Sequence, residues 1–128
     1  KLNALTRNVR GKRLILVDDS IVRGTTSRKI VEMLRTAGAK EVHMRISAPP
    51  FTHSCHFGTD IDSEENLIAN KMSIPEICQH IGADSLGYIS IKGLKEACHT
   101  SRARFCTGCF SGEYPIDVGQ DHHKNQFE

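Results

Sequence analysis

Apolar and polar residues along the chain alternate between the period of a strand and that of a helix. Residues 14–17 form a continuous apolar run of strand length, as in a strand inside a sheet. After a polar loop, apolar side chains recur at helical spacing up to residue 37, with a hydroxyl residue among 25–27 available as the N-cap and Gly38 as a left-handed stop. Residues 42–48 alternate apolar and polar before two prolines, which is typical of a strand with one less buried face. This order predicts two parallel strands joined by a right-handed crossover.

The second half of the chain has shorter elements. Residues 51–61 lack a periodic pattern and are expected to form a loop. Ser73 with Glu76, and Pro75 between them, predicts a capped helix that Gly82 closes. The other expected elements are a short helix beginning within residues 62–69, a third strand over residues 85–90 and a last short helix over residues 94–99. The predicted fold class is α/β, with a mainly parallel sheet flanked by helices over residues 1–99, and an irregular cysteine-containing segment with a loosely ordered tail over residues 100–128.

Composition narrows the class of protein. The 128 residues suffice for one domain, and 38% apolar with 25% charged residues is ordinary for a globular fold. The longest apolar run is far shorter than the roughly 20 residues of a membrane span, and no signal-peptide pattern is visible, so we expect neither membrane insertion nor secretion. A net charge of +2, few aromatic residues and no tryptophan argue against nucleic acid as a partner. The 5 cysteines, an odd number, favour free thiols or metal ligands in a reducing compartment, and we expect a cytoplasmic location.

The clearest candidate site is the loop over residues 18–26, which follows the first strand and leads into a helix. In open α/β sheets, ligands bind outside the carboxyl ends of the strands. The backbone N–H groups of a glycine-containing loop, the hydroxyls of Thr25 and Thr26 and the positive end of the helix dipole all favour a phosphate, and Arg23 adds positive charge. The adjacent carboxylates of Asp18 and Asp19 would repel a phosphate, so they suit a ligand that also offers hydroxyls or a divalent metal, as a sugar phosphate with Mg²⁺ does. The plainer interpretation is that the acidic pair caps a turn and the threonines cap a helix.

The loop residues 17–26, Val-Asp-Asp-Ser-Ile-Val-Arg-Gly-Thr-Thr, resemble the phosphoribosyl pyrophosphate loop of the type I phosphoribosyltransferases. Blocks at residues 38–42, 47–50, 58–61, 67–69 and 106–115 extend the resemblance over nearly the whole chain, in the order of the glutamine amidophosphoribosyltransferase family. The resemblance implies a partial type I phosphoribosyltransferase fold. It also implies that the chain is the carboxyl-terminal piece of a longer enzyme, inactive by itself. The implied reaction turns phosphoribosyl pyrophosphate, glutamine and water into 5-phosphoribosylamine, glutamate and pyrophosphate, the first committed step of purine synthesis.

The resemblance implies roles for the loop residues. Asp18 and Asp19 would hold the ribose hydroxyls and Mg²⁺. The residues implied to bind the rest of the substrate, above all its 5′-phosphate, are Ser20, Arg23, Gly24, Thr25 and Thr26. No catalytic nucleophile is expected here, because pyrophosphate leaves through an oxocarbenium-like state that needs positioning and charge stabilisation, and the glutaminase nucleophile would lie upstream. The family further implies feedback inhibition by purine nucleotides and a homo-oligomer, a tetramer.

Cys106 and Cys109 have a spacing that suits zinc, an iron–sulfur cluster or a redox dithiol. A redox pair is disfavoured, because the two cysteines lie in an expected loop of small residues and not at a helix start after a strand. In the iron–sulfur subset of the family, cysteines in these contexts bind the cluster, so the resemblance implies that Cys55, Cys106 and Cys109 are three ligands of a [4Fe–4S] cluster, with the fourth upstream. Zinc is the alternative metal, with a fourth ligand from among His53, His56 and His99.

Two other functions stay open. A phosphoribosyltransferase that acts on a purine or pyrimidine base would share the loop but has no evident use for the three cysteines. A regulator that keeps the same fold as a ligand sensor without catalysis would carry a DNA-binding segment, and the chain has no helix-turn-helix pattern.

Overall fold

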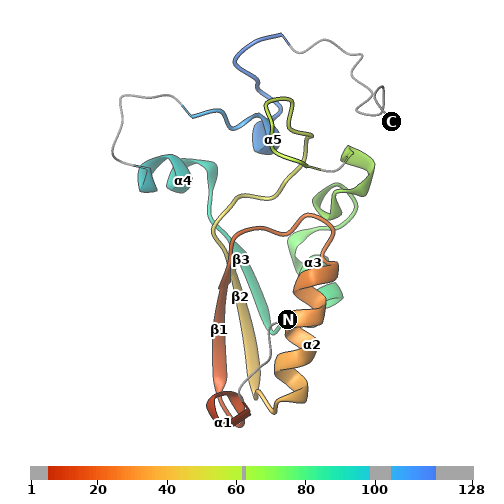
Figure 1. Ribbon diagram of the computed structural model, residues 1–128, viewed down its shortest axis with the longest axis vertical. Coiled ribbons are helices and arrows are strands. Elements are labelled where there is room, and N and C mark those ends of the chain that lie inside the picture. Colours follow the sequence, from red (N-terminus) through yellow and green to blue (C-terminus); the bar gives the residue numbers. More distant parts are fainter. Residues whose placement is uncertain (1–5, 62, 99–104, 118–128) are drawn as a thin grey trace.

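Three parallel strands form the sheet of the computed structural model, which describes residues 6–61, 63–98 and 105–117. They lie in the order β1 (Arg13–Asp18), β2 (Glu41–Ile46) and β3 (Ser85–Tyr88). The two longer helices, α2 (Thr25–Thr36) and α3 (Ile74–Ile81), lie on one side of the sheet, and the cysteine-bearing segment lies beyond the carboxyl ends of the strands (Figure 1). The predicted parallel α/β architecture is therefore confirmed.

The other helical elements are short. They are α1 (Thr6–Val9), the 3₁₀ turns η1 (Glu64–Asn66) and η2 (Ile68–Asn70), α4 (Ile91–Ala97) and α5 (Gly108–Ser111). The longest helix, α2, has 12 residues, and no helix in the described part of the chain is long and apolar enough to cross a membrane.

The main core lies between the sheet and the helices α2 and α3. Val42 and Met44 of β2 are fully buried there, because the alternation along this strand turns them toward Val31 of α2 and toward Ile77 and Ile81 of α3. Helix α3 has the predicted capping box of Ser73 and Glu76, and Gly82 ends it in the left-handed conformation with φ 77°. Local capping and strand alternation thus build this core as the sequence predicts.

Strand β1 is predicted as an interior strand, and within the described residues it pairs with β2. There it lies at the edge of the sheet, and the residues Ile15 and Val17 are 72% and 70% exposed. Its apolar run is continuous because the strand has apolar side chains on both faces, of which α2 and α3 cover only one. A parallel sheet is usually covered on both faces, so the exposed apolar face is compatible with an interior strand, and that position stays a prediction.

Several element boundaries also differ from the prediction. The helix expected within residues 62–69 is two 3₁₀ turns, and residue 62 lies outside the described residues. Helix α4 begins three residues earlier than expected, because the Ser90 hydroxyl accepts a hydrogen bond from Gly93 N–H at 3.0 Å. Helices α1 and α5 were not predicted, since four residues are too few to show a helical period. The expected tail over residues 120–128 lies outside the described residues.

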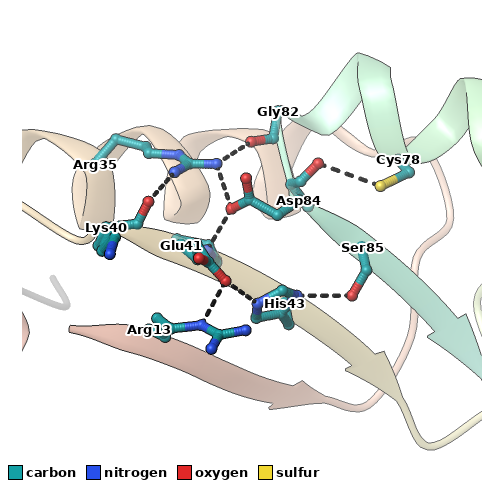
Figure 2. Close-up of polar contacts among 11 residues, drawn as sticks. Arg13, Arg35, Lys40, Glu41, His43, Cys78, Gly82, Asp84 and Ser85 are labelled. Carbon is teal, nitrogen blue, oxygen red and sulfur yellow. Dashed lines mark hydrogen bonds and ion pairs between the residues drawn. The ribbon is translucent and has the colours of Figure 1, made fainter.

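An ion pair ties helix α2 to the start of β3 (Figure 2). Arg35 donates to Asp84 Oδ2 at 2.6 Å and to the carbonyl oxygens of Gly82 and Lys40. The same Asp84 oxygen accepts the backbone N–H of Val42 at 2.6 Å, so one carboxylate joins α2, β2 and β3. The hydrogen bond from Val42 lowers the pKa of Asp84 below its ordinary 3.8, and Arg35 lowers it further against the opposing effect of partial burial.

Replacing Asp84 with asparagine should remove an acid-sensitive part of the stability. The folded-state pKa of Asp84 lies below its unfolded value, so its contribution is present above about pH 4 and is lost as the pH falls through the folded pKa. We expect Asp84→Asn to lower the free energy of unfolding by about 1 kcal/mol at pH 7, a modest effect because solvent screens a pair that is a third exposed. The melting temperatures of the variant and the parent should converge between pH 7 and pH 3.

The matched control is Glu32→Gln, which removes an exposed carboxylate paired with Arg28 at 2.9 Å within one helix. Its cost should stay near 0.3–0.5 kcal/mol at pH 7, as for other pairs of this spacing. A gap between Asp84→Asn and the parent that stays constant down to pH 3 would contradict the assigned role of the Asp84 charge.

Candidate functional site

The candidate site is the loop that joins the carboxyl end of β1 to helix α2. Strand β1 ends at Asp18, whose carbonyl oxygen accepts hydrogen bonds from the backbone N–H of Ser47 at 2.9 Å and from its hydroxyl at 3.2 Å. These contacts hold the ends of β1 and β2 together. The loop therefore begins from a fixed position at the edge of the sheet where ligands of open α/β folds bind.

The acidic pair makes the local contacts of a turn. Asp18 Oδ1 accepts the backbone N–H of Asp19 at 3.0 Å, and Asp19 Oδ1 accepts the hydroxyl of Ser20 at 2.7 Å. Asp18 and Ser20 are half-buried and Asp19 is exposed. The plainer interpretation of the pair as turn residues thus has structural support. Because these contacts use Oδ1 of each carboxylate, they are compatible with a ligand at Oδ2.

Two neighbouring residues of the loop anchor it in two different cores. Ile21 is buried in the main core at 3% exposure, whereas Val22 packs against a second core formed by Phe51, Ile61 and Leu67. Arg23 next to them is exposed. The loop is thereby fixed by its apolar side chains while it presents polar groups to solvent.

Helix α2 begins without the predicted side-chain cap. Its N-cap is Gly24, in the left-handed conformation with φ 79°, and the expected capping by a hydroxyl residue among 25–27 is wrong. Thr25 and Thr26 are the first two residues of the helix and are exposed, whereas Ser27 is buried. Because no side chain caps this end, the first N–H groups of α2, the helix dipole and the two hydroxyls form a surface suited to an anion.

Gly24 is required for two independent reasons. Its positive φ strains any residue with a Cβ atom, and a Cβ placed there would lie 2.8 Å from Cδ1 of Ile68. Ile68 also donates its backbone N–H to the carbonyl oxygen of Val22 at 2.9 Å. The turn η2 thus contacts the loop through both the side chain and the backbone of Ile68. Sequence reasoning included residues 67–69 in the family resemblance but assigned Ile68 no role, because only the tertiary contact with Gly24 reveals one.

The three cysteines implied as cluster ligands lie in one region, beyond the carboxyl ends of the strands. Cys55 and Cys109 pack against the second core, and Cys106 is exposed. Burial raises the pKa of the Cys109 thiol, and the nearness of Cys55 and Cys106 raises it further. In the described part of the chain, no group of three or more histidine, cysteine, aspartate or glutamate side chains is arranged to hold a metal ion. The soft thiol donors of this region nevertheless are of the type that iron–sulfur clusters and zinc prefer.

The Cys-x-x-Cys segment is not the loop that the sequence predicts. Cys109 lies within the short helix α5, and the backbone N–H of Gly108 points to Cys106 Sγ at 3.5 Å. Gly108 leaves room for the Tyr114 ring, and the Tyr114 hydroxyl donates to the carbonyl oxygen of Ser54 at 2.6 Å. The loop of Cys55 and the segment of Cys109 are therefore held against each other. The remaining described cysteines, Cys78 and Cys98, are half-buried, and Cys78 Sγ donates to a backbone carbonyl oxygen.

Comparisons with known proteins identify relatives over nearly the whole chain. Amidophosphoribosyltransferase of Synechococcus elongatus is 54% identical over 121 residues, which are 94% of this chain and 24% of the relative. The Bacillus subtilis amidophosphoribosyltransferase is 50% identical over 94% of this chain and 26% of the relative. The chloroplastic amidophosphoribosyltransferase 2 of Arabidopsis thaliana is 50% identical over 97% of this chain and 22% of the relative. No protein-family model matches the chain.

A solved structure agrees with these relatives. The glutamine phosphoribosylpyrophosphate amidotransferase of Bacillus subtilis, in complex with ADP and GMP, superimposes with a TM-score of 0.84 at 49% identity, over 93% of this chain and 27% of the other. Fold and loop together define the chain as part of a phosphoribosyltransferase-type α/β domain. By sequence it is homologous to the amidophosphoribosyltransferases, and it spans about a quarter of the length of the curated relatives it matches.

Proposed function

We propose that the chain forms the phosphoribosyl pyrophosphate-binding part of a glutamine amidophosphoribosyltransferase. The observation that carries this proposal is the loop between β1 and α2, with its acidic pair, left-handed Gly24 and uncapped helix start. The chain that contains this loop is 54% and 50% identical to two enzymes of that name. The reaction would convert phosphoribosyl pyrophosphate, glutamine and water into 5-phosphoribosylamine, glutamate and pyrophosphate. The names of the relatives favour this function over a base-acting phosphoribosyltransferase or a regulator.

Two kinds of group in the loop would bind two different parts of the substrate. Asp18 and Asp19 would accept hydrogen bonds from the ribose hydroxyls and hold Mg²⁺, for which carboxylate oxygens are suitable ligands. The 5′-phosphate would accept hydrogen bonds from the N–H groups at the start of α2. The side chains that would assist there are those of Ser20, Arg23, Thr25 and Thr26. Bound Mg²⁺ would neutralise charge on the leaving pyrophosphate. The carboxylates would lie on the side of the sugar where positive charge develops, so their negative charge would stabilise it.

The function is tested with the full-length protein, Mg²⁺, phosphoribosyl pyrophosphate and glutamine. We expect pyrophosphate and glutamate to appear together, and both to depend on Mg²⁺. Failure of the full-length protein to release pyrophosphate would refute the proposed function.

Cys55, Cys106 and Cys109 are proposed as three ligands of a [4Fe–4S] cluster, with zinc as the alternative metal. The thiol donors, their common region and the match to the family's cysteine contexts support this proposal. Such a cluster would supply a cross-link between α5 and the loop of Cys55, and phosphoribosyl transfer itself needs no electron transfer.

Metal analysis distinguishes the two possibilities. Protein purified without oxygen should contain iron and acid-labile sulfide, and Cys109→Ser should lower both, whereas Cys78→Ser should leave both unchanged. Zinc without sulfide would instead indicate a zinc site.

Regulation, assembly and location follow from the same family. Purine nucleotides are proposed as feedback inhibitors, since the Bacillus subtilis relative was solved with ADP and GMP. A homo-oligomer, tetrameric as in the family, and a cytoplasmic location are proposed with it.

A further inference from the structure

The second core joins the substrate loop to the cysteine-bearing segment. Its buried residues Phe51, Ile61 and Leu67 contact Val22 of the loop on one side, and Cys109 and Phe110 of α5 are packed against the same core. The ring centroids of Phe51 and Phe110 lie 4.9 Å apart. Because a core of three buried side chains is small, a change on one side alters the packing available to the other.

A series of hydrogen bonds makes the same connection through backbone groups and the side chain of Asn70. The carbonyl oxygen of Cys109 accepts the N–H groups of Thr52 and His53 at 3.0 and 3.1 Å. The side-chain amide of Asn70 donates to the carbonyl oxygen of Thr52 at 2.9 Å, and Asn70 belongs to η2. The first residue of η2, Ile68, donates its N–H to the carbonyl oxygen of Val22, and its side chain lies next to Gly24. The path from Cys109 to the substrate loop is thus continuous.

We propose that Val22 and η2 are positioning elements that couple the order of the α5 segment to the affinity of the loop for its phosphoribosyl ligand. This inference rests on the proposed function. Residues of the loop take their binding conformation only while the second core holds Val22 and while η2 supports Gly24. The coupling is reciprocal, as linkage requires, so ligand bound at the loop must in turn order the contacts between Cys109 and residues 52–53.

A double-mutant cycle in the full-length protein tests this coupling. Val22→Ala, Phe110→Ala and the double variant are compared for the dissociation constant of phosphoribosyl pyrophosphate with Mg²⁺, measured by calorimetry at a temperature where every variant is folded. Each single change should weaken binding about 2- to 30-fold. The double variant should weaken it by clearly less than the product of the two factors, because both changes disrupt one core.

Val9→Ala is the matched control, since it removes the same atoms from a buried position on α1 that belongs to neither of the two cores. It should lower the melting temperature at least as much as Val22→Ala and leave the dissociation constant within about twofold. If Phe110→Ala does not fold, Asn70→Ala replaces it in the cycle, because this exposed side chain can be shortened without opening a cavity.

Hydrogen exchange gives a readout that stability alone would not move. Bound ligand should slow exchange of the Thr52 and His53 amides in the parent, and less so in Val22→Ala. Additive effects on binding, equal effects of Val22→Ala and Val9→Ala, or unchanged exchange at residues 52–53 would each overturn the inference and leave the proposed function intact. Absence of ligand binding by the unaltered protein would overturn both.

Discussion

Replacing Gly24 with alanine is expected to abolish measurable binding of phosphoribosyl pyrophosphate and to destabilise the fold by roughly 2–4 kcal/mol. The left-handed backbone at φ 79° alone costs a residue with a side chain about 1–2 kcal/mol. The added methyl group would also lie 2.8 Å from Ile68 Cδ1, so the end of the buried Ile68 side chain or the loop must shift. Because Gly24 is the N-cap of α2, relief of the backbone strain there displaces the N–H groups that would bind the phosphate. Thermal unfolding should show a melting temperature lower by roughly 10 °C.

Gly11 is a matched control for this prediction. It also has a positive φ, 72°, but a Cβ atom there would have no neighbour within 4 Å. Gly11→Ala should therefore cost only the backbone strain, about 1 kcal/mol, and leave ligand binding unchanged. The difference between the two variants measures the contact with Ile68. Normal binding by a folded Gly24→Ala protein would show that the start of α2 does not hold the ligand.

Replacing Asp18 or Asp19 with asparagine should lower kcat/KM of the full-length enzyme by about 10- to 100-fold each, as expected for the loss of a hydrogen bond to a charged group. Asparagine keeps Oδ1, which accepts the Asp19 N–H at 3.0 Å and the Ser20 hydroxyl at 2.7 Å, so the turn itself should survive. The carboxylate charge is lost, and the Mg²⁺ concentration needed for half-maximal rate should rise. The substitution thus separates the two interpretations of the acidic pair.

Glu96→Gln controls for the loss of one negative charge. Its carboxylate is exposed on α4 and lies 3.8 Å from Lys92 of the same helix. This variant should have the kinetics of the parent. If Asp18→Asn and Asp19→Asn also kept parental rates and Mg²⁺ dependence, the pair would be only a turn.

Much of the fold could be predicted because its signals are local. Ser73, Glu76 and Gly82 bound α3 through contacts within a few residues, and the alternation around Val42 and Met44 depends only on the geometry of a strand. The chemistry of the candidate site is equally local, since its polar residues are consecutive between β1 and α2. The family resemblance added the ligand, and the comparisons confirm the family while leaving the individual residue roles as predictions.

Other features could not be predicted because they depend on contacts between distant residues. The N-cap of α2 was assigned to the hydroxyl residues, since threonine and serine are common caps, but the chain enters the helix through Gly24. The sequence also does not show that Val22 packs against the second core while its neighbour Ile21 packs into the main core.

By itself, the sequence determined the order of the elements, the polar loop at a strand end and the thiols available for a metal, because periodicity, capping and side-chain chemistry act over a few neighbouring residues. Only the tertiary structure decided that Ile68 lies beneath Gly24 and that Val22 and Cys109 share one small core. The reason is that those neighbours are far apart in the chain and meet only when the sheet, η2 and α5 pack together.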